Sequence, residues 1–109
     1  MKEVLKKIKR IEECLADGQT IACIDAGNGS SGVSLMRDIE DLENYELYDA
    51  EYLTRQEFES EYELTVEDCF SFECGDWLDM SDIEGFVKYT DPDNMESNPW
   101  RLYVAVYNY

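Results

Sequence analysis

The sequence contains no histidine, the side chain that most often acts as a general base at neutral pH. No serine lies in a Gly-x-Ser-x-Gly elbow, and the spacings of Cys14, Cys23, Cys69 and Cys74 match no familiar zinc pattern. Cys69 and Cys74 lie in an acidic stretch, which favours the neutral thiol over the reactive thiolate. With 26 acidic residues, close carboxylate pairs are expected on any fold and carry no evidence of catalysis. We therefore expect a protein that is not an enzyme and that uses no metal and no cofactor.

Long hydrophobic segments are missing as well. Residues 1–8 mix lysines with apolar residues and lack the continuous apolar core of a signal peptide, and no later run approaches the length of a membrane span. We expect a cytoplasmic protein without membrane contact. In that compartment the four cysteines stay reduced, and we expect them to serve as small buried hydrophobic residues.

Basic residues become scarce after position 37. Residues 1–37 carry a net charge of +1, whereas residues 38–109 hold three basic and 21 acidic side chains, a net charge of −18. Such a field repels nucleic acid and attracts basic protein surfaces. The 44% of hydrophobic residues argue against disorder, and 109 residues fit one domain, residues 1–109. The composition therefore predicts one folded acidic domain with a basic protein as its partner, either as a monomer or as a dimer.

Apolar residues recur at helical spacing at the start of the chain. Val4, Ile8 and Ile11 mark one face of an amphipathic helix over residues 2–17, and Gly18 is expected to follow its C-terminal end. Basic residues crowd the first half of this helix, against the direction that the helix dipole favours. This basic face is either simply solvated, or it neutralises the acidic body or contacts a partner.

Alternating or β-branched patterns predict the strands. The stretches expected as strands are 19–26, 33–36, 45–48, 69–74 and 100–107, with 45–48 at an edge and 100–107 well inside the sheet. A capping-box pattern at Ser81-Asp82-Ile83-Glu84 predicts the start of a short helix, and one or two surface helical turns are expected over residues 37–43. The fold class is therefore α+β: an N-terminal amphipathic helix plus a small, mainly antiparallel sheet with two or three short helices.

The segment from Ile24 to Ser31, with the sequence Ile-Asp-Ala-Gly-Asn-Gly-Ser-Ser, resembles the strand and phosphate loop of the actin, Hsp70 and sugar-kinase superfamily. That resemblance implies a fold with two large domains and a second phosphate loop, which 109 residues cannot hold. We therefore expect residues 27–32 to be the loop of a hairpin rather than a nucleotide site.

An aspartate pair, Asp91 and Asp93, lies in an expected turn and raises the question of a bound cation. A calcium loop of the EF-hand type needs an oxygen ligand at the fifth position and glycine at the sixth. Met95 and Glu96 stand there instead. The pattern does not predict an EF-hand, and whether a divalent cation binds stays open.

Four glutamates alternate with other residues over residues 57–64: Glu57, Glu59, Glu61 and Glu63. As a strand, this segment would place all four on one face about 6.6 Å apart, and as a helix it would place them in two pairs about 5–6 Å apart. A capping box starting at Thr54 and the helix propensity of glutamate favour the helix, with the strand as the alternative. Either geometry spaces negative charges much like phosphates along a nucleic-acid strand.

In size and charge, although not in any motif, the chain resembles the small acidic anti-CRISPR and antirestriction proteins of phages, several of which mimic DNA. The resemblance implies an inhibitor that occupies the basic nucleic-acid site of a nuclease. The alternative is an antitoxin or immunity protein that caps a basic toxin through aromatic anchors amid the acids, and a ligand-binding module is more distant. The residues expected to bind the partner are Glu46, Tyr48, Asp49, Glu51, Tyr52, Glu57, Glu59, Glu61, Tyr62 and Glu63.

Overall fold

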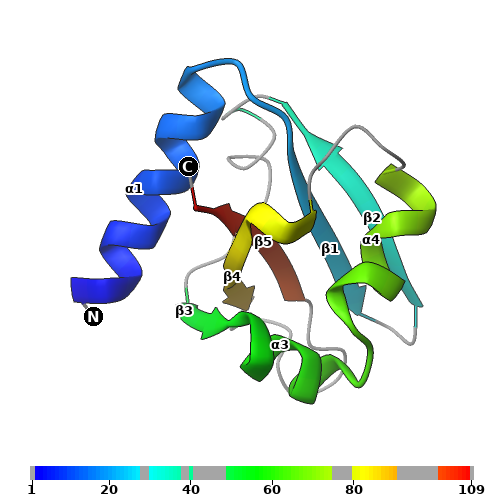
Figure 1. Cartoon of the computed structure of the whole chain (residues 1–109). Helices are drawn as coiled ribbons and strands as arrows, with labels where there is room; N and C mark the ends of the chain where they lie inside the picture. The colour runs from blue at the N-terminus through cyan, green and yellow to red at the C-terminus, as the bar shows by residue number, and fades with distance from the viewer. Residues whose placement is uncertain are drawn as a thin grey trace.

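A computed structural model gives the structure of residues 2–27, 30–37, 40, 49–74, 80–90 and 101–108. These residues form an α+β fold, as the sequence predicts (Figure 1). The elements in chain order are α1 (Lys2–Ala16), β1 (Ile21–Gly27), β2 (Ser30–Met36), β3 (Asp49–Thr54), α3 (Arg55–Tyr62), α4 (Val66–Cys74), a 3₁₀ turn (Met80–Asp82), β4 (Ile83–Thr90) and β5 (Arg101–Tyr107).

The five strands form one antiparallel sheet in the order β2-β1-β5-β4-β3. β5 occupies the centre, so the prediction that the last strand lies well inside the sheet is confirmed. β1 and β2 form a hairpin in which Gly27 pairs with Ser30, which confirms the hairpin expected there. The strand β2 begins at Ser30, earlier than the sequence pattern predicted, because the pairing continues to the end of β1.

Helices cover both faces of this sheet. Because successive side chains of a strand point to opposite faces, Phe86 of β4 and Tyr103 of β5 share one face, where both rings contact Phe58 of α3. On the other face Tyr52 of β3 lies beneath Lys7 of α1, whose Nζ is 5.0 Å from the ring centroid. Figure 1 shows α1 on one side of the sheet and α3 and α4 on the other. Residues 102–107 of β5 are consequently all buried.

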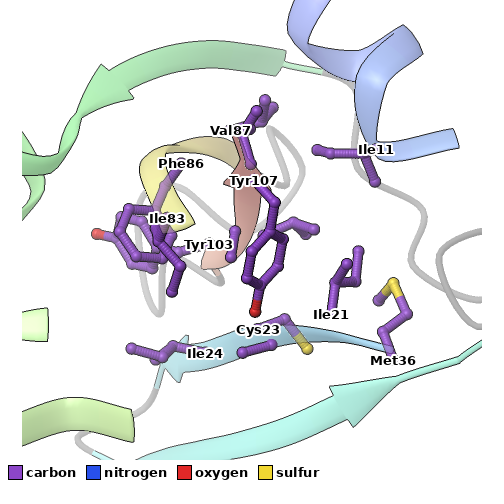
Figure 2. Close-up of a cluster of buried hydrophobic side chains, with 14 of the residues drawn as sticks. Ile11, Ile21, Cys23, Ile24, Met36, Ile83, Phe86, Val87, Tyr103 and Tyr107 are labelled. Carbon is purple, nitrogen blue, oxygen red and sulfur yellow. The ribbon is translucent and has the colours of Figure 1, made fainter. Parts of the chain in front are cut away.

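The hydrophobic core follows this central strand. Figure 2 shows apolar side chains from β1, β4 and β5 gathered in the interior, with Ile11 of α1 above Ile21 and Met36. Ile11, Ile21 and Met36 are each at most 2% exposed. The helical stripe that the sequence predicted is therefore the face by which α1 packs.

The C-terminal end of α1 shows how local sequence sets an element boundary. Gly18 has a φ of +80°, its N–H donates to the carbonyl of Leu15, and the N–H of Gln19 donates to the carbonyl of Cys14, both at 3.0 Å. These two hydrogen bonds form a Schellman motif, in which the left-handed residue is most often glycine. The predicted helix end at Gly18 is confirmed.

The prediction of a strand over residues 69–74 is wrong, because these residues belong to α4. The alternation of Phe70 and Phe72 suggested a period of two. The period of the packed face is helical and begins earlier: Val66, Cys69 and Phe70 are buried at spacings of three and four. Thr65 caps this helix, since its Oγ1 accepts a hydrogen bond from the N–H of Asp68 at 3.1 Å.

The prediction of a helix starting at Ser81 is also wrong. Residues 80–82 form a single 3₁₀ turn, and Ile83–Thr90 is the strand β4 between β3 and β5. Gly85 inside this segment disfavours a helix by about 1 kcal/mol. Most of the other residues in this segment are β-branched or aromatic, types that favour strands. Pairing with strands on both sides therefore overrides the local capping signal.

The expected edge strand at residues 45–48, the turn containing Asp91 and Asp93, and most of the expected helical turns at 37–43 lie outside the described residues. The edge strands of the described sheet are β2 and β3, residues 30–36 and 49–54.

Candidate partner-binding surface

The segment that holds the four alternating glutamates is helical. Thr54 caps α3: its Oγ1 accepts from the N–H of Glu57 at 3.2 Å, and the Glu57 Oε1 accepts from the N–H of Thr54 at 3.1 Å. This reciprocal pair is the capping box that the sequence indicated. The favoured prediction of a helix over residues 55–63 is therefore confirmed, with α3 ending at Tyr62 and capped by Glu63.

A cluster of aromatic rings fixes α3 and α4 to the sheet. The ring of Phe58 stacks on Phe86 with centroids 4.0 Å apart and meets the edge of Tyr103 at 5.3 Å. Tyr62 stacks on Phe58 at 5.5 Å, and Phe70 of α4 stacks on Phe86 at 5.8 Å. Phe58, Phe70 and Phe86 are fully buried. These rings leave the polar faces of both helices toward solvent.

Two cations tie several of the predicted site carboxylates to the rest of the fold. The first is Arg55, which pairs with Glu59 one turn later in α3 at 3.8 Å and with Glu67 in the first turn of α4. Its guanidinium also donates to the carbonyl of Met80 at 2.8 Å. Arg55 therefore joins α3, α4 and the 3₁₀ turn, and Glu59 has a structural role as well as a charge.

The second cation is Lys88 of β4, whose side chain is only 14% exposed. Its Nζ lies 2.7 Å from an oxygen of Glu61 and 3.7 Å from an oxygen of Glu51. The hydroxyl of Tyr103 donates to the other Glu61 oxygen at 3.2 Å, and burial together with the Glu61 charge raises the pKa of Tyr103 to about 12. Glu61 is thus shared between a lysine and a buried phenol.

The fourth glutamate, Glu63, differs from the other three in its backbone conformation. It ends α3 in the left-handed conformation, with a φ of 65°, and its N–H donates to the carbonyl of Glu59 at 2.9 Å. This conformation costs a non-glycine residue about 1–2 kcal/mol. Glu63 and the neighbouring Leu64 are exposed, Leu64 to 49%.

We define the acidic surface as the carboxylates of β3, α3 and the first turn of α4 whose side chains the structure describes. Its seven members are Glu51, Glu57, Glu59, Glu61, Glu63, Glu67 and Asp68. Arg55 and Lys88 are each shared by two of them, so the surface keeps a net charge of −5. Six of the seven are exposed, and Glu59 is partly buried.

The structure places the aromatic candidates among internal contacts. Tyr52 is half-buried under Lys7, and Tyr62 is half-buried against Phe58 and Tyr103. Neither ring protrudes as a free anchor. The side chain of Asp49 lies outside the described part of the chain, as do the whole of Glu46 and Tyr48.

Three cysteines are described with their side chains, Cys14, Cys23 and Cys69, and all three are buried free thiols. Burial raises the pKa of Cys14 and Cys69. Among the described residues, no three Cys, Asp or Glu side chains gather around a common position for a metal ion. The helices in the same part of the chain are all too short or too polar to cross a membrane.

No family model matches this chain, and comparison with curated proteins and with solved structures found no match either.

Sequence reasoning missed Arg55, Lys88, Glu67 and Asp68 as parts of this surface. One signal was available for the two acids: Thr65-x-x-Asp68 repeats the capping pattern of Thr54-x-x-Glu57, which predicts a second helix start. Lys88 had no such signal, because its carboxylate partner Glu61 is 27 residues away.

Proposed function

We propose that this protein is an inhibitor that binds the basic nucleic-acid site of a target, such as a CRISPR or restriction nuclease, with its acidic surface standing in for the nucleic-acid backbone. The observation that carries the proposal is the acidic surface itself: seven carboxylates on β3, α3 and α4 with only two cations, both shared between acids. In this proposal the protein acts in the cytosol and binds no nucleic acid directly.

Geometry and charge both favour a basic protein partner. The net charge of −17 steers the chain toward positive surfaces and away from phosphates. Carboxylates within one Debye length, about 8 Å at physiological salt, act on a partner together. The capping box, Arg55 and Lys88 hold several of them in fixed positions, which lowers the entropy that binding would otherwise cost.

An antitoxin that caps a basic toxin remains the second candidate. The apolar residue in a position to act as its anchor is Leu64, which is 49% exposed amid the acids. Tyr52 and Tyr62, expected as anchors, are engaged in internal contacts. The two candidates differ in whether the partner's own ligand is a nucleic acid.

The test is a competition experiment. The partner is captured from a host lysate at low salt, eluted with salt, and bound to a fluorescently labelled nucleic acid, and this protein is then added. We expect it to displace the nucleic acid and to do so less well as the salt concentration rises. A stable complex of all three components would rule out occlusion, and a partner that binds no nucleic acid would favour the antitoxin.

The matched variants use carboxylates that form no ion pair with the described residues. Glu63→Gln with Asp68→Asn removes two exposed charges from the acidic surface, and we expect a loss of affinity of about tenfold, since each interfacial charge contributes on the order of 0.5–1 kcal/mol. Glu12→Gln with Asp17→Asn removes the same charge from α1 and the turn that follows it, on the opposite face of the sheet. That control should stay within about twofold, and equal losses in both variants would mean that only total charge matters.

A further inference from the structure

The strand β3 forms one edge of the sheet (Figure 1). On its inner side, Asp49–Thr54 pairs in continuous register with Thr90–Gly85 of β4. No strand of the described residues pairs with its outer side. Alternate N–H and C=O groups of an edge strand point away from the sheet, where another extended chain can pair with them.

Several common devices that protect an edge are absent from β3. Its six residues include no proline and no lysine, and the irregularity in the pairing lies between Ile83 and Gly85 of β4. The charged residues of β3 are both acidic, Asp49 and Glu51. Such an edge admits a partner strand, but it selects the partner by charge.

The surroundings of β3 are negative. Burial raises the pKa of Tyr52, in the middle of the strand, and the carboxylates of Glu84, Glu3 and Glu57 raise it further, whereas Lys7 alone lowers it. Three acids and one base therefore act on this position. A basic segment would find complementary charge along the edge.

A second copy of the chain fits poorly here. A second β3 strand would add another Asp49 and Glu51 to the same edge without any lysine or arginine to offset them, and like charges in one region repel. Two chains of net charge −17 also repel each other at longer range.

We propose that β3 accepts an extended basic segment of the partner protein as a sixth strand of the sheet, with its lysine or arginine side chains beside Glu51 and Glu57. The inference rests on the proposed function, since it assumes the same basic partner. Main-chain hydrogen bonds supply affinity in such strand addition, and the alternate side chains supply specificity. Strand addition at β3 would extend the partner-binding site beyond the acidic surface, and binding there would depend on backbone pairing as well as on charge.

The probe is a capped seven-residue peptide of alternating lysine and valine. A matched peptide with proline in place of the central valine has the same charge but cannot pair as a strand. We expect the first peptide to bind about tenfold more tightly, because pairing adds main-chain hydrogen bonds that the proline peptide cannot make, and to shift the amide resonances of residues 49–54. Equal binding of both peptides, or resonance shifts confined to α3 and α4, would overturn strand addition.

Two proline variants test the edge itself. Ala50 and Glu51 are adjacent, so the N–H of one points to β4 and that of the other points outward. The two variants are Ala50→Pro and Glu51→Pro. The one that removes the outward-pointing N–H should keep the wild-type far-UV spectrum and lose the tenfold preference for the alternating peptide over the proline peptide. Glu51→Gln is the charge control. A folded variant that keeps the preference would refute the proposal. Slow amide exchange along both sides of β3 in the free protein would refute it too, because the edge would then be covered.

The two proposals fail separately. If the peptides bind equally while nucleic acid is still displaced from the partner, strand addition is wrong and the proposed function stands. If the strand peptide binds β3 while the partner holds nucleic acid and this protein together, occlusion is wrong and strand addition stands for a basic partner of another kind.

Discussion

Glu61 and Glu63 carry the same charge two residues apart, yet the structure assigns them different roles. The Glu61 carboxylate pairs with Lys88 at 2.7 Å and accepts from the Tyr103 hydroxyl at 3.2 Å, whereas Glu63 lies exposed at the end of α3. Replacing each by glutamine removes one negative charge and keeps the side-chain size. Comparing the two variants therefore separates the effect of losing a negative charge from the effect of losing the contacts of Glu61.

The expected cost of Glu61→Gln follows from what Lys88 loses. The Lys88 side chain is 14% exposed, and among the described carboxylates its ammonium would retain Glu51, at 3.7 Å. Hydrogen bonds to charged groups contribute about 1.5–3 kcal/mol, and the partial exposure of Glu61, 34%, reduces this toward the low end. We expect the free energy of unfolding to fall by about 1–2 kcal/mol, and Glu63→Gln to change it by less than about 0.5 kcal/mol.

The measurement is urea unfolding followed by circular dichroism at pH 7, extrapolated linearly to zero denaturant. A loss of about 1–2 kcal/mol corresponds to a melting temperature lower by about 4–12 °C for a domain of this size. If both variants unfold within 0.5 kcal/mol of the wild type, Glu61 is a free surface charge and the reasoning from its contacts is wrong. Glu61 would then belong with Glu63 as a residue available to the partner.

Two further predictions concern the sheet. Gly85→Ala should lower the free energy of unfolding by about 1–3 kcal/mol in the same urea assay, because an added Cβ would lie 2.4 Å from both the Leu53 carbonyl oxygen and the Tyr52 hydroxyl; an unchanged stability would show that β3 can move away freely. Burial raises the pKa of both Tyr89 and Tyr103 to about 12, above the value near 10 of an exposed tyrosine, so their contribution to stability is present below pH 10 and is lost between about pH 10 and 12. Absorbance at 295 nm should show at least two late-ionising phenols, and Tyr89→Phe should remove one of them without loss of stability, because this buried hydroxyl has no hydrogen-bond partner among the described residues; ionisation of all eight tyrosines near pH 10 would contradict it.

The sequence determined those elements whose signals are local. The amphipathic period and Gly18 define α1 and its end, the Thr54 capping box starts α3, and the alternation in residues 101–107 marks β5. In each case the stabilising contacts join residues within a few positions of each other, or the apolar residues follow a single period, helical or alternating, that is compatible with one type of element. The concentration of acid after residue 37 is likewise a property of composition.

Tertiary structure decided what depends on distant partners. The segment Ile83–Thr90 carries a helix signal at its start and is nevertheless a strand, because β3 and β5 offer it hydrogen bonds on both sides. Residues 69–74 alternate and are nevertheless helical, because the buried face begins at Val66 and packs on Phe86 through Phe70. Local propensity is worth less than 1 kcal/mol per residue, and burial or sheet pairing exceeds it.

The same division applies to the acidic surface. The sequence supplied four evenly spaced glutamates, but only the fold brought Lys88 to Glu61 and placed Arg55 between Glu59 and Glu67. Glu63, at the end of α3, forms no ion pair with the described residues. An ion pair between residues far apart in the chain leaves no pattern in the sequence, since either partner alone is an ordinary charged residue. Which acids hold the protein together and which face a partner is therefore a property of the three-dimensional structure.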